Sequence, residues 1–325
     1  MRNPEVAGRI TLQHSVALIA ATGCILCGGR NVMAADQQPQ KSIVYKTIGP
    51  RQVMADLDYP PDWKSTDKRP AIVFFSGGAW TTGSTRAFLA QGKYFAKRGL
   101  VCVRADYRLR IKDNITIDKC VEDAKSAMRW VRGHAIQLGI DPNRIVASGG
   151  SAGGHLAACT FFVEGCNAKD DDLSVSPKPN AMILFNPCLD VRALKESENL
   201  AKLVVGMDEQ TMKQISPLFF VSKNTPPTLI IDGTKDMFNA EIREFINKSK
   251  EVGAPSVEGY FVEGQSHGFF NKAPFQEQTA LRADEFLRSI GYLKDEPKVA
   301  YESRVASEGA GGDLPGKAKN RQRSP

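Results

Sequence analysis

The sequence predicts an α/β fold with a mostly parallel central sheet and helices on both faces of that sheet. Short runs of β-branched and aromatic residues alternate with longer segments of helical periodicity, which is the pattern of strands joined by crossovers. The first two strand segments follow each other directly and are expected to form an antiparallel hairpin. Every later strand is followed by a crossover, so the rest of the sheet is predicted to be parallel, and no internal repeat is visible.

The elements follow from these patterns in chain order. The predicted strands are Ile43–Ile48, Gln52–Asp58, Ala71–Ser76, Val101–Asp106, Arg144–Ser148, Ala181–Asn186, Thr228–Asp232 and Val257–Val262. The predicted helices are Thr85–Arg98, Ile117–Leu138, Ala152–Val163, Ala240–Glu251 and Gln276–Ile290. Ligands of such sheets bind beyond the carboxyl ends of the strands. The strand ends where we expect chemistry are Ser76, Ser148, Asn186 and Asp232.

The composition of the 325-residue chain excludes several protein classes. With 42% hydrophobic and 24% charged residues, it is neither collagen-like, coiled-coil nor wholly disordered. The net charge of +7 lies mostly in the ends: residues 1–35 carry three basic residues against one acidic, and residues 298–325 carry six against three. The +2 that remains for residues 36–297 is too little for a nucleic-acid surface.

The N-terminus has the features of a secretory signal peptide, residues 1–35. Arg2 and Arg9 precede a twelve-residue apolar stretch, Val16–Cys27, which is too short to span a bilayer. The mature chain is expected to begin near Ala35 or Asp36, which places the protein in a secreted or periplasmic location. An uncleaved amphipathic helix and a lipid anchor are the alternatives. Residues 36–297 are predicted to form one catalytic domain and residues 298–325 a disordered basic tail.

The serine of Gly149-Gly150-Ser151-Ala152-Gly153 is the candidate nucleophile. This G-x-S-x-G segment follows a predicted strand and opens a predicted helix, so Ser151 is expected on a tight turn that exposes its Oγ. A side chain at Gly149 or Gly153 would collide across that turn. The alternatives are a phosphate-binding turn or tight packing alone, but no Lys or Arg follows to bind a nucleotide.

A serine hydroxyl needs a neighbouring base, and His267 is the candidate among four histidines. His14 lies in the predicted signal peptide and His134 in a helix. His155 is one helical turn after Ser151 and is expected to point along the packed turn rather than at Oγ. His267 lies in a loop directly after a predicted strand. The alternative is that His267 is an ordinary loop residue.

Three carboxylates could orient this histidine. Asp236 lies in the turn beyond the strand Thr228–Asp232, and a turn residue can reach a histidine loop of the adjacent strand. Asp190 remains an alternative, as does Asp232, which we expect to be satisfied by backbone amides. The chain order Ser, Asp, His, with Asp236 as the acid, is that of one of the three common serine-hydrolase arrangements.

Two loops offer backbone donors for a developing oxyanion. Gly77-Gly78-Ala79-Trp80 follows the strand Ala71–Ser76, and its small residues let the main chain approach a substrate carbonyl. The N–H of Ala152, next to the nucleophile, supplies a further donor. Gly77 and Gly78 could also form merely a turn.

At these residues the sequence resembles the hormone-sensitive-lipase-like carboxylesterases of the α/β-hydrolase fold, and within them secreted bacterial acetylesterases and feruloyl and acetyl-xylan esterases. The resemblance extends from about Pro70 to Leu293. The segments that carry it are Phe74–Trp80, Asp106–Leu109, Asp123–Arg132, Gly149–Gly154, Pro226–Ile230, Gly233–Asp236 and Ser266–Phe270. It implies that Ser151, Asp236 and His267 form the catalytic triad. It also implies that Gly78, Ala79 and Ala152 form the oxyanion hole.

The sequence departs from this family at two places. The family usually has His-Gly-Gly-Gly in the oxyanion loop, where this chain has Ser76 and Ala79 at the first and last positions, and Ala tolerates positive φ poorly. The family often inserts a cap domain where this chain has only Val191–Ser216, which implies a minimal cap and an open site. Trp80 could bind a sugar or aryl group of the substrate, or it could pack under the loop.

The sequence therefore predicts a serine carboxylesterase that acts on small-molecule or polysaccharide esters of short acyl groups. We expect no cofactor, no metal, no nucleic-acid partner and no stable membrane insertion. The alternatives are a serine peptidase of the same fold and a non-catalytic binding protein. A charged helical face is expected to be solvated; it consists of Asp123, Lys125, Arg129 and Arg132. Whether Cys159 and Cys166 form a disulfide is left open.

Overall fold

The structure, a computed structural model, describes residues 41–254 and 256–302. The predicted signal peptide lies outside these residues, and so does the predicted tail beyond residue 302. The first residues assigned to that tail are folded: Tyr301 is buried against Tyr94, their ring centroids 5.5 Å apart, and Glu302 forms an ion pair with Lys97. The boundary predicted at residue 297 is therefore too early, because an aromatic side chain anchors the chain beyond it.

Eight strands form one sheet in the order β1-β2-β4-β3-β5-β6-β7-β8. The strands are β1 (Ser42–Ile48), β2 (Arg51–Asp58), β3 (Arg69–Phe75), β4 (Val101–Ala105), β5 (Ile140–Gly150), β6 (Ala181–Phe185), β7 (Thr228–Gly233) and β8 (Val257–Val262). The pairs β1/β2 and β2/β4 are antiparallel, and all later pairs are parallel. The predicted hairpin and the mostly parallel sheet are thus confirmed.

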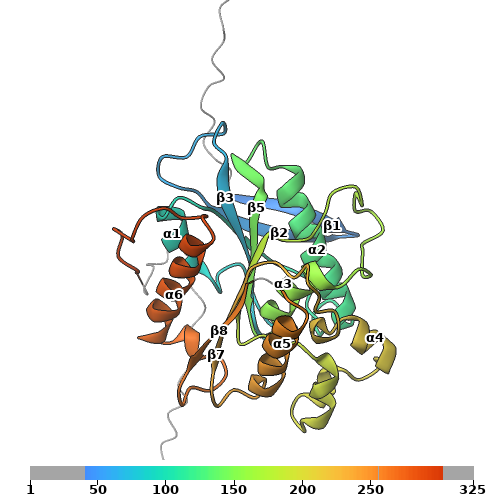
Figure 1. Ribbon diagram of the computed structural model, residues 1–325. Helices are drawn as coiled ribbons and strands as arrows, with labels where there is room; N and C mark the ends of the chain where they lie inside the picture. Colours follow the sequence, from blue (N-terminus) through green and yellow to red (C-terminus); the bar gives the residue numbers. More distant parts are fainter. Residues whose placement is uncertain (1–40, 255, 303–325) are drawn as a thin grey trace, which may run out of the picture. The chain divides into compact units, whose positions relative to one another are not determined.

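Helices cover both faces of the sheet (Figure 1), as predicted. The long helices are α1 (Leu89–Lys97), α2 (Ile117–Gly133), α3 (Ala152–Phe162), α5 (Asn239–Glu251) and α6 (Phe275–Ser289). Helices α1 and α6 pack on one face through side chains such as Phe95 and Phe286, and α2, α3 and α5 pack on the other through side chains such as Leu156 and Phe245. None of the described helices is long and apolar enough to cross a membrane.

The segment predicted as a minimal cap contains short helices that the sequence patterns did not reveal. It follows β6 and comprises the 3₁₀ turns η1 (Val191–Glu196) and η2 (Ala201–Leu203) and the six-residue helix α4 (Glu209–Gln214). Asp190 and Asp208 accept backbone N–H groups at the starts of η1 and α4. A third turn, η3 (Pro217–Phe219), returns the chain towards β7.

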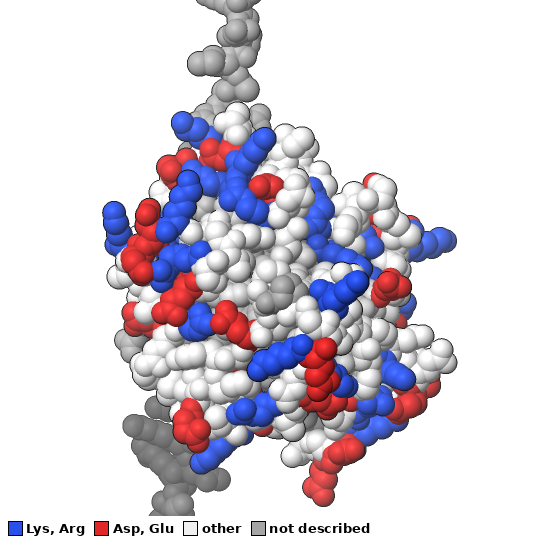
Figure 2. All heavy atoms as spheres, viewed as in Figure 1, with Lys and Arg blue, Asp and Glu red and all other residues white. Residues whose placement is uncertain are grey.

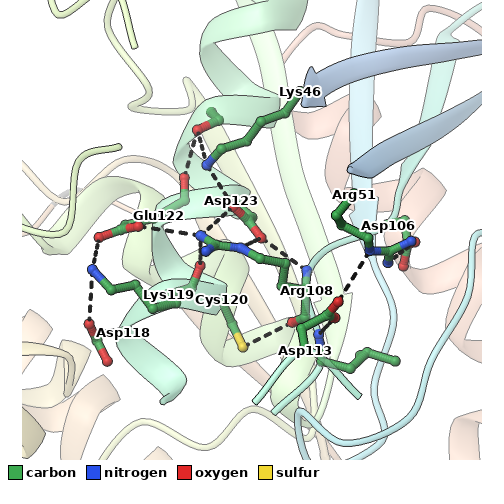
Figure 3. A network of polar contacts seen from close by, with 12 residues as sticks. Lys46, Arg51, Asp106, Arg108, Asp113, Asp118, Lys119, Cys120, Glu122 and Asp123 are labelled. Atoms are coloured by element: carbon green, nitrogen blue, oxygen red, sulfur yellow. Dashed lines mark hydrogen bonds and ion pairs between the residues drawn. The ribbon is translucent and has the colours of Figure 1, made fainter. Parts of the chain in front are cut away.

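Three of the four charged residues predicted to form a solvated face of α2 are buried, and the fourth, Arg132, is half-buried, which contradicts the prediction. Asp123 is fully buried and accepts hydrogen bonds from Lys46 of β1 at 2.6 Å and from the Arg108 guanidinium at 2.7 and 2.9 Å (Figure 3). Lys125 donates to main-chain carbonyls just beyond the end of α3, and burial lowers the pKa of its ammonium to about 8. Arg129 pairs with Asp171 at 2.7 Å.

These buried charges are each paired with a distant segment, which periodicity within α2 could not indicate. On the molecular surface, by contrast, basic and acidic side chains are interspersed over the face drawn in Figure 2.

Two contacts hold the segment that follows β4. Arg51 pairs with Asp106 at 3.1 Å, and the hydroxyl of Tyr107 donates to the main-chain carbonyl of Ser76 at 2.8 Å. The strand end of β4 is thereby tied to the end of β3.

Candidate active site

Ser151 lies between β5 and α3 on a strained turn. Its φ and ψ are 54° and −120°, a conformation that is rare for a residue with a side chain. The turn closes so tightly that a Cβ on Gly149 would overlap the main chain of Gly153, and a Cβ on Gly153 would overlap the main-chain carbonyl of Phe75. The expected need for glycine at both positions is confirmed. The N–H of Ser151 donates to the Phe185 carbonyl at 2.8 Å, which holds the turn against β6.

His267 reaches Ser151 from the loop after β8. Its Nε2 lies 2.7 Å from Ser151 Oγ, and Phe238 packs edge-on against the imidazole with ring centroids 5.3 Å apart. The structure thus brings the predicted base to the predicted nucleophile. The phenyl ring limits the rotation of the imidazole and covers it on one side.

The other described histidines are occupied elsewhere. His134 lies at the end of α2, stacked on Trp130 with ring centroids 4.2 Å apart. His155 is buried and its Nε2 lies 2.7 Å from the Ile215 carbonyl, so it points away from Ser151 Oγ, and burial lowers its pKa to about 4. His14 lies outside the described residues.

Asp236 is the carboxylate that contacts His267. Its Oδ2 lies 2.8 Å from Nδ1 of the imidazole, and its Oδ1 accepts the backbone N–H of Phe238 at 2.8 Å. Asp190 instead accepts the backbone N–H and the guanidinium of Arg192. The structure therefore joins Asp236, and not Asp190, to the histidine.

Asp232 has a different environment from the one expected. It was predicted to be held by backbone amides, but its two oxygens accept from the side-chain amides of Asn186 at 2.6 Å and Asn239 at 2.7 Å. Burial raises the pKa of Asp232 to about 6, and the neighbouring charge of Asp236 raises it as well. The backbone N–H of Gly233 also acts on Asp232 and lowers its pKa, so the prediction is incomplete. The sequence patterns do not reveal the two side-chain amides, because they come from other elements, at the end of β6 and the start of α5.

Two polar residues near the site were not identified from the sequence. The sequence predicts Asn186 only as the end of a strand, yet its Nδ2 donates to both Asp232 and Asp236. Glu241 of α5 accepts the backbone N–H groups of Leu189 and Asp190 at 2.5 and 3.3 Å, and burial raises its pKa to about 8. The position of Asn186 at the carboxyl end of a parallel strand is the sequence feature that could have indicated its role. No such feature marks Glu241, because it occupies an ordinary helical position.

The loop after β3 lies against the nucleophile turn. A Cβ on Gly77 would lie 2.8 Å from the carbonyl oxygen of Gly150, so the two backbones are in close approach. Gly78 has φ +117° and Ala79 has φ +51°, so the expected strain at Ala79 is present. In the described residues the backbone N–H groups of Gly78, Ala79 and Ala152 donate to no protein acceptor. They remain free to donate to an oxyanion near Ser151.

Trp80 does not offer its ring to a substrate, so its predicted role in substrate binding is wrong. The side chain is only 2% exposed, and its Nε1 lies 3.2 Å from Nδ1 of His155. A buried indole needs such a hydrogen-bond partner, and His155 on α3 provides it beneath the loop. Trp80 therefore supports the loop from the core side.

A cavity of about 570 Å³ opens beside Ser151 and His267. The cap segment contributes an apolar wall to it, consisting of Leu194, Leu200 and Leu203. Further apolar side chains come from loops around the site: Ala87, Phe88, Met237, Phe238 and Phe270.

The described residues contain no group of three or more His, Cys, Asp or Glu arranged to bind a metal ion. All five described cysteines are free thiols, including Cys159 and Cys166.

Comparison with curated proteins finds ester hydrolases. The chain is 26% identical over 256 residues to the probable carboxylic ester hydrolase LipM of Mycobacterium tuberculosis, covering 72% of this chain and 58% of LipM. It is 28% identical over 247 residues to the probable isoprenylcysteine alpha-carbonyl methylesterase ICMEL1 of Arabidopsis thaliana, covering 70% of this chain and 50% of the relative. The chain thus spans half to three fifths of the length of these relatives.

Comparison with solved structures gives higher identities. The apo form of Thermogutta terrifontis esterase 2 is 42% identical, with 79% of this chain and 98% of that chain covered and a TM-score of 0.73. Its propionate-bound form is 41% identical, with 79% and 96% covered and the same TM-score. A protein family described as BD-FAE matches residues 56–241, more than half of the chain. The chain belongs to the BD-FAE family, within the hormone-sensitive-lipase-like carboxylesterases of the α/β-hydrolase fold.

Proposed function

We propose that this protein is a serine carboxylesterase that hydrolyses short-chain acyl esters through an acyl-enzyme. The observation that carries the proposal is the continuous hydrogen-bond path from Ser151 Oγ through the His267 imidazole to Asp236, with distances of 2.7 and 2.8 Å. A nucleophile, a base and an orienting carboxylate in this geometry are what acyl transfer requires.

In the proposed reaction, Ser151 Oγ attacks the ester carbonyl carbon while its proton passes to Nε2 of His267. The negative charge on the carbonyl oxygen is held by the free backbone N–H groups of Gly78, Ala79 and Ala152. Cleavage of the bond to the alcohol oxygen releases the alcohol, which takes the proton from the imidazolium. Water then attacks the acyl-enzyme by the same route, with His267 as its base, and the carboxylic acid leaves as Ser151 regains its proton.

The cavity supports a short acyl group as the preferred substrate. The cap segment places Leu194, Leu200 and Leu203 over the site, which gives an apolar pocket without the extended cover of a large inserted domain. The related Thermogutta terrifontis esterase 2 has been solved in propionate-bound and butyrate-bound forms. For the alcohol side we propose acetylated or feruloylated polysaccharide, because the sequence motifs resemble those of feruloyl and acetyl-xylan esterases.

The test is ester hydrolysis by the wild-type protein and by Ser151→Ala. Aryl esters of increasing acyl length, acetylated xylan and a feruloylated sugar serve as substrates. We expect Ser151→Ala to lose about 10³-fold or more in kcat with an unchanged circular dichroism spectrum. Paraoxon, which phosphorylates the related esterase, should add one phosphoryl group to the wild-type protein and none to the variant. A variant that retained more than about 1% of kcat would remove Ser151 from the mechanism.

A further inference from the structure

Two buried carboxylates are joined by one amide at the carboxyl ends of β6 and β7. Nδ2 of Asn186 donates to Oδ1 of Asp232 at 2.6 Å and to Oδ2 of Asp236 at 2.7 Å. A carboxamide nitrogen has two hydrogens, so each carboxylate receives one. Because Asp236 also contacts His267, the path from the imidazole continues through Asn186 to a second negative charge.

This arrangement is costly for the fold. Asn186 has φ +44°, and its Oδ1 is buried without a hydrogen-bond partner in the described part of the chain. Both aspartates are buried, and burying two like charges side by side is unfavourable. Stability alone would favour an apolar or neutral pair at these positions. Strained backbone and unfavourably buried polar groups of this kind are typical of residues in catalytic sites.

The remaining polar groups around the pair are few. Asn239 donates to the second oxygen of Asp232 at 2.7 Å and is itself held by Arg243 at 2.8 Å. Glu241 is the other carboxylate near Asp236, and it is committed to backbone N–H groups of the loop after β6. Among the described side chains that contact either aspartate, His267, which contacts Asp236, is the one that becomes positively charged in the proposed reaction. The charge of Arg243 reaches Asp232 only through Asn239.

We propose that Asn186 and Asp232 are positioning residues for the reaction. Asn186 fixes the Asp236 carboxylate in the orientation that meets Nδ1 of His267. The negative charge of Asp232 adds to that of Asp236 in stabilising the imidazolium that forms when Ser151 gives up its proton. In a buried site of low dielectric constant such a charge acts over several ångströms. The inference rests on the proposed function, because it requires His267 to be the base.

The test measures kcat and kcat/KM against pH on an aryl acetate for Asp232→Asn, Asn186→Gly and the control Asp190→Asn. Asp232→Asn keeps the shape, removes one charge and replaces one of the two oxygens that accept from Asn186 and Asn239 with an NH₂ group, so we expect kcat on the pH plateau to fall about 5- to 10-fold. The acid limb of kcat/KM, which reports protonation of the base, should move to lower pH by about half a unit to one unit. A purely structural role would not move that limb.

Asn186→Gly keeps the backbone free to adopt positive φ and removes the side chain with its carboxamide. We expect kcat to fall about 10- to 100-fold, the effect of losing a hydrogen bond to a charged group, with little change in KM. Asp190→Asn should behave as wild type, because Asp190 does not contact the pair. Circular dichroism counts the folded fraction of each variant.

Ser151→Ala separates the two hypotheses. If it loses hydrolysis while Asp232→Asn keeps the wild-type plateau and acid limb, the proposed function stands and this inference is overturned. If Asn186→Gly keeps the wild-type kcat, the positioning role of Asn186 is overturned as well. If Ser151→Ala remains active, the proposed function itself fails.

Discussion

Replacing Asp236 with Asn tests the proposed triad more sharply than deleting the side chain, because the shape is kept. Both oxygens of the carboxylate accept hydrogen bonds in the structure: Oδ2 lies 2.7 Å from Nδ2 of Asn186 and 2.8 Å from Nδ1 of His267, and Oδ1 accepts the Phe238 N–H at 2.8 Å. All three neighbours can donate. An asparagine has only one carbonyl oxygen, so one of the two positions must receive an NH₂ group.

Each orientation of the new amide has a distinct cost. With the NH₂ group at the Oδ2 position, it faces the amide of Asn186, and Nδ1 of His267 must accept a hydrogen bond. The imidazole proton then lies on Nε2, where it cannot receive the proton of Ser151. With the NH₂ group at the Oδ1 position, it faces the N–H of Phe238, which costs about 1–3 kcal/mol for an unsatisfied buried donor. In both orientations the negative charge of Asp236, which directly contacts the imidazolium, is gone.

We therefore expect Asp236→Asn to lower kcat about 10³- to 10⁴-fold near neutral pH, with a smaller change in KM. The assay is hydrolysis of an aryl acetate, expressed as kcat per folded molecule, with circular dichroism to count folded protein. Asp190→Asn is the control, since that carboxylate pairs with Arg192 rather than with the histidine. If Asp236→Asn stayed within about tenfold of wild type, or if Asp190→Asn were the inactive variant, the assignment of the acid would be wrong.

Three further outcomes are expected. Gly153→Ala should lower the free energy of unfolding in urea by about 3 kcal/mol or more, because its Cβ would overlap the Phe75 carbonyl, whereas Gly165→Ala, which has open space around it, should not. Asp123→Asn should lower the free energy of unfolding by about 3–5 kcal/mol, because Lys46 and Arg108 lose their buried counter-charge. The control is Glu258→Gln, which removes a charge from an exposed pair with Arg282. An equal effect of the two substitutions would contradict the prediction. Hydrolysis should fall steeply beyond about six acyl carbons, and sustained activity on long-chain esters would show that the small cap does not limit the acyl group.

The fold and the members of the site could be predicted because each depended on local patterns. Buried parallel strands appear as short β-branched runs, and β8 was predicted with the bounds that the structure has, Val257–Val262. Ser151 is in a segment whose glycines are required by close backbone approach, and elimination among four histidines left His267. The turn residue Asp236 was preferred on reach alone, and the structure places it at the histidine.

The features that could not be predicted depend on partners far away in the sequence. The charged residues of α2 have helical spacing that is also typical of a solvated face, and only the fold brings Lys46, 77 residues before Asp123, to its carboxylate. The sequence is equally consistent with Trp80 facing the substrate or packing under the loop, and the contact with His155 decides between the two. The role of Asn186 depends on the relative positions of two strand ends, those of β6 and β7, because neither of its carboxylate partners is near it in the chain.

The backbone strain of this protein is concentrated where its proposed chemistry is. Among the described non-glycine residues, six have positive φ, and four of them lie beyond the carboxyl ends of β3, β5 and β6: Ala79, Trp80, Ser151 and Asn186. Each such conformation costs about 1–3 kcal/mol. Three of the four residues present a group that regular structure would direct elsewhere, namely the backbone N–H of Ala79, the hydroxyl of Ser151 and the bridging amide of Asn186. The parallel strands β3, β5 and β6 pair side by side, and β3, β6 and residues 145–150 of β5 are almost wholly buried. Since this packing fixes the strand ends, the turns between them can hold conformations that no isolated segment would adopt, and the site can be preorganised before substrate binds.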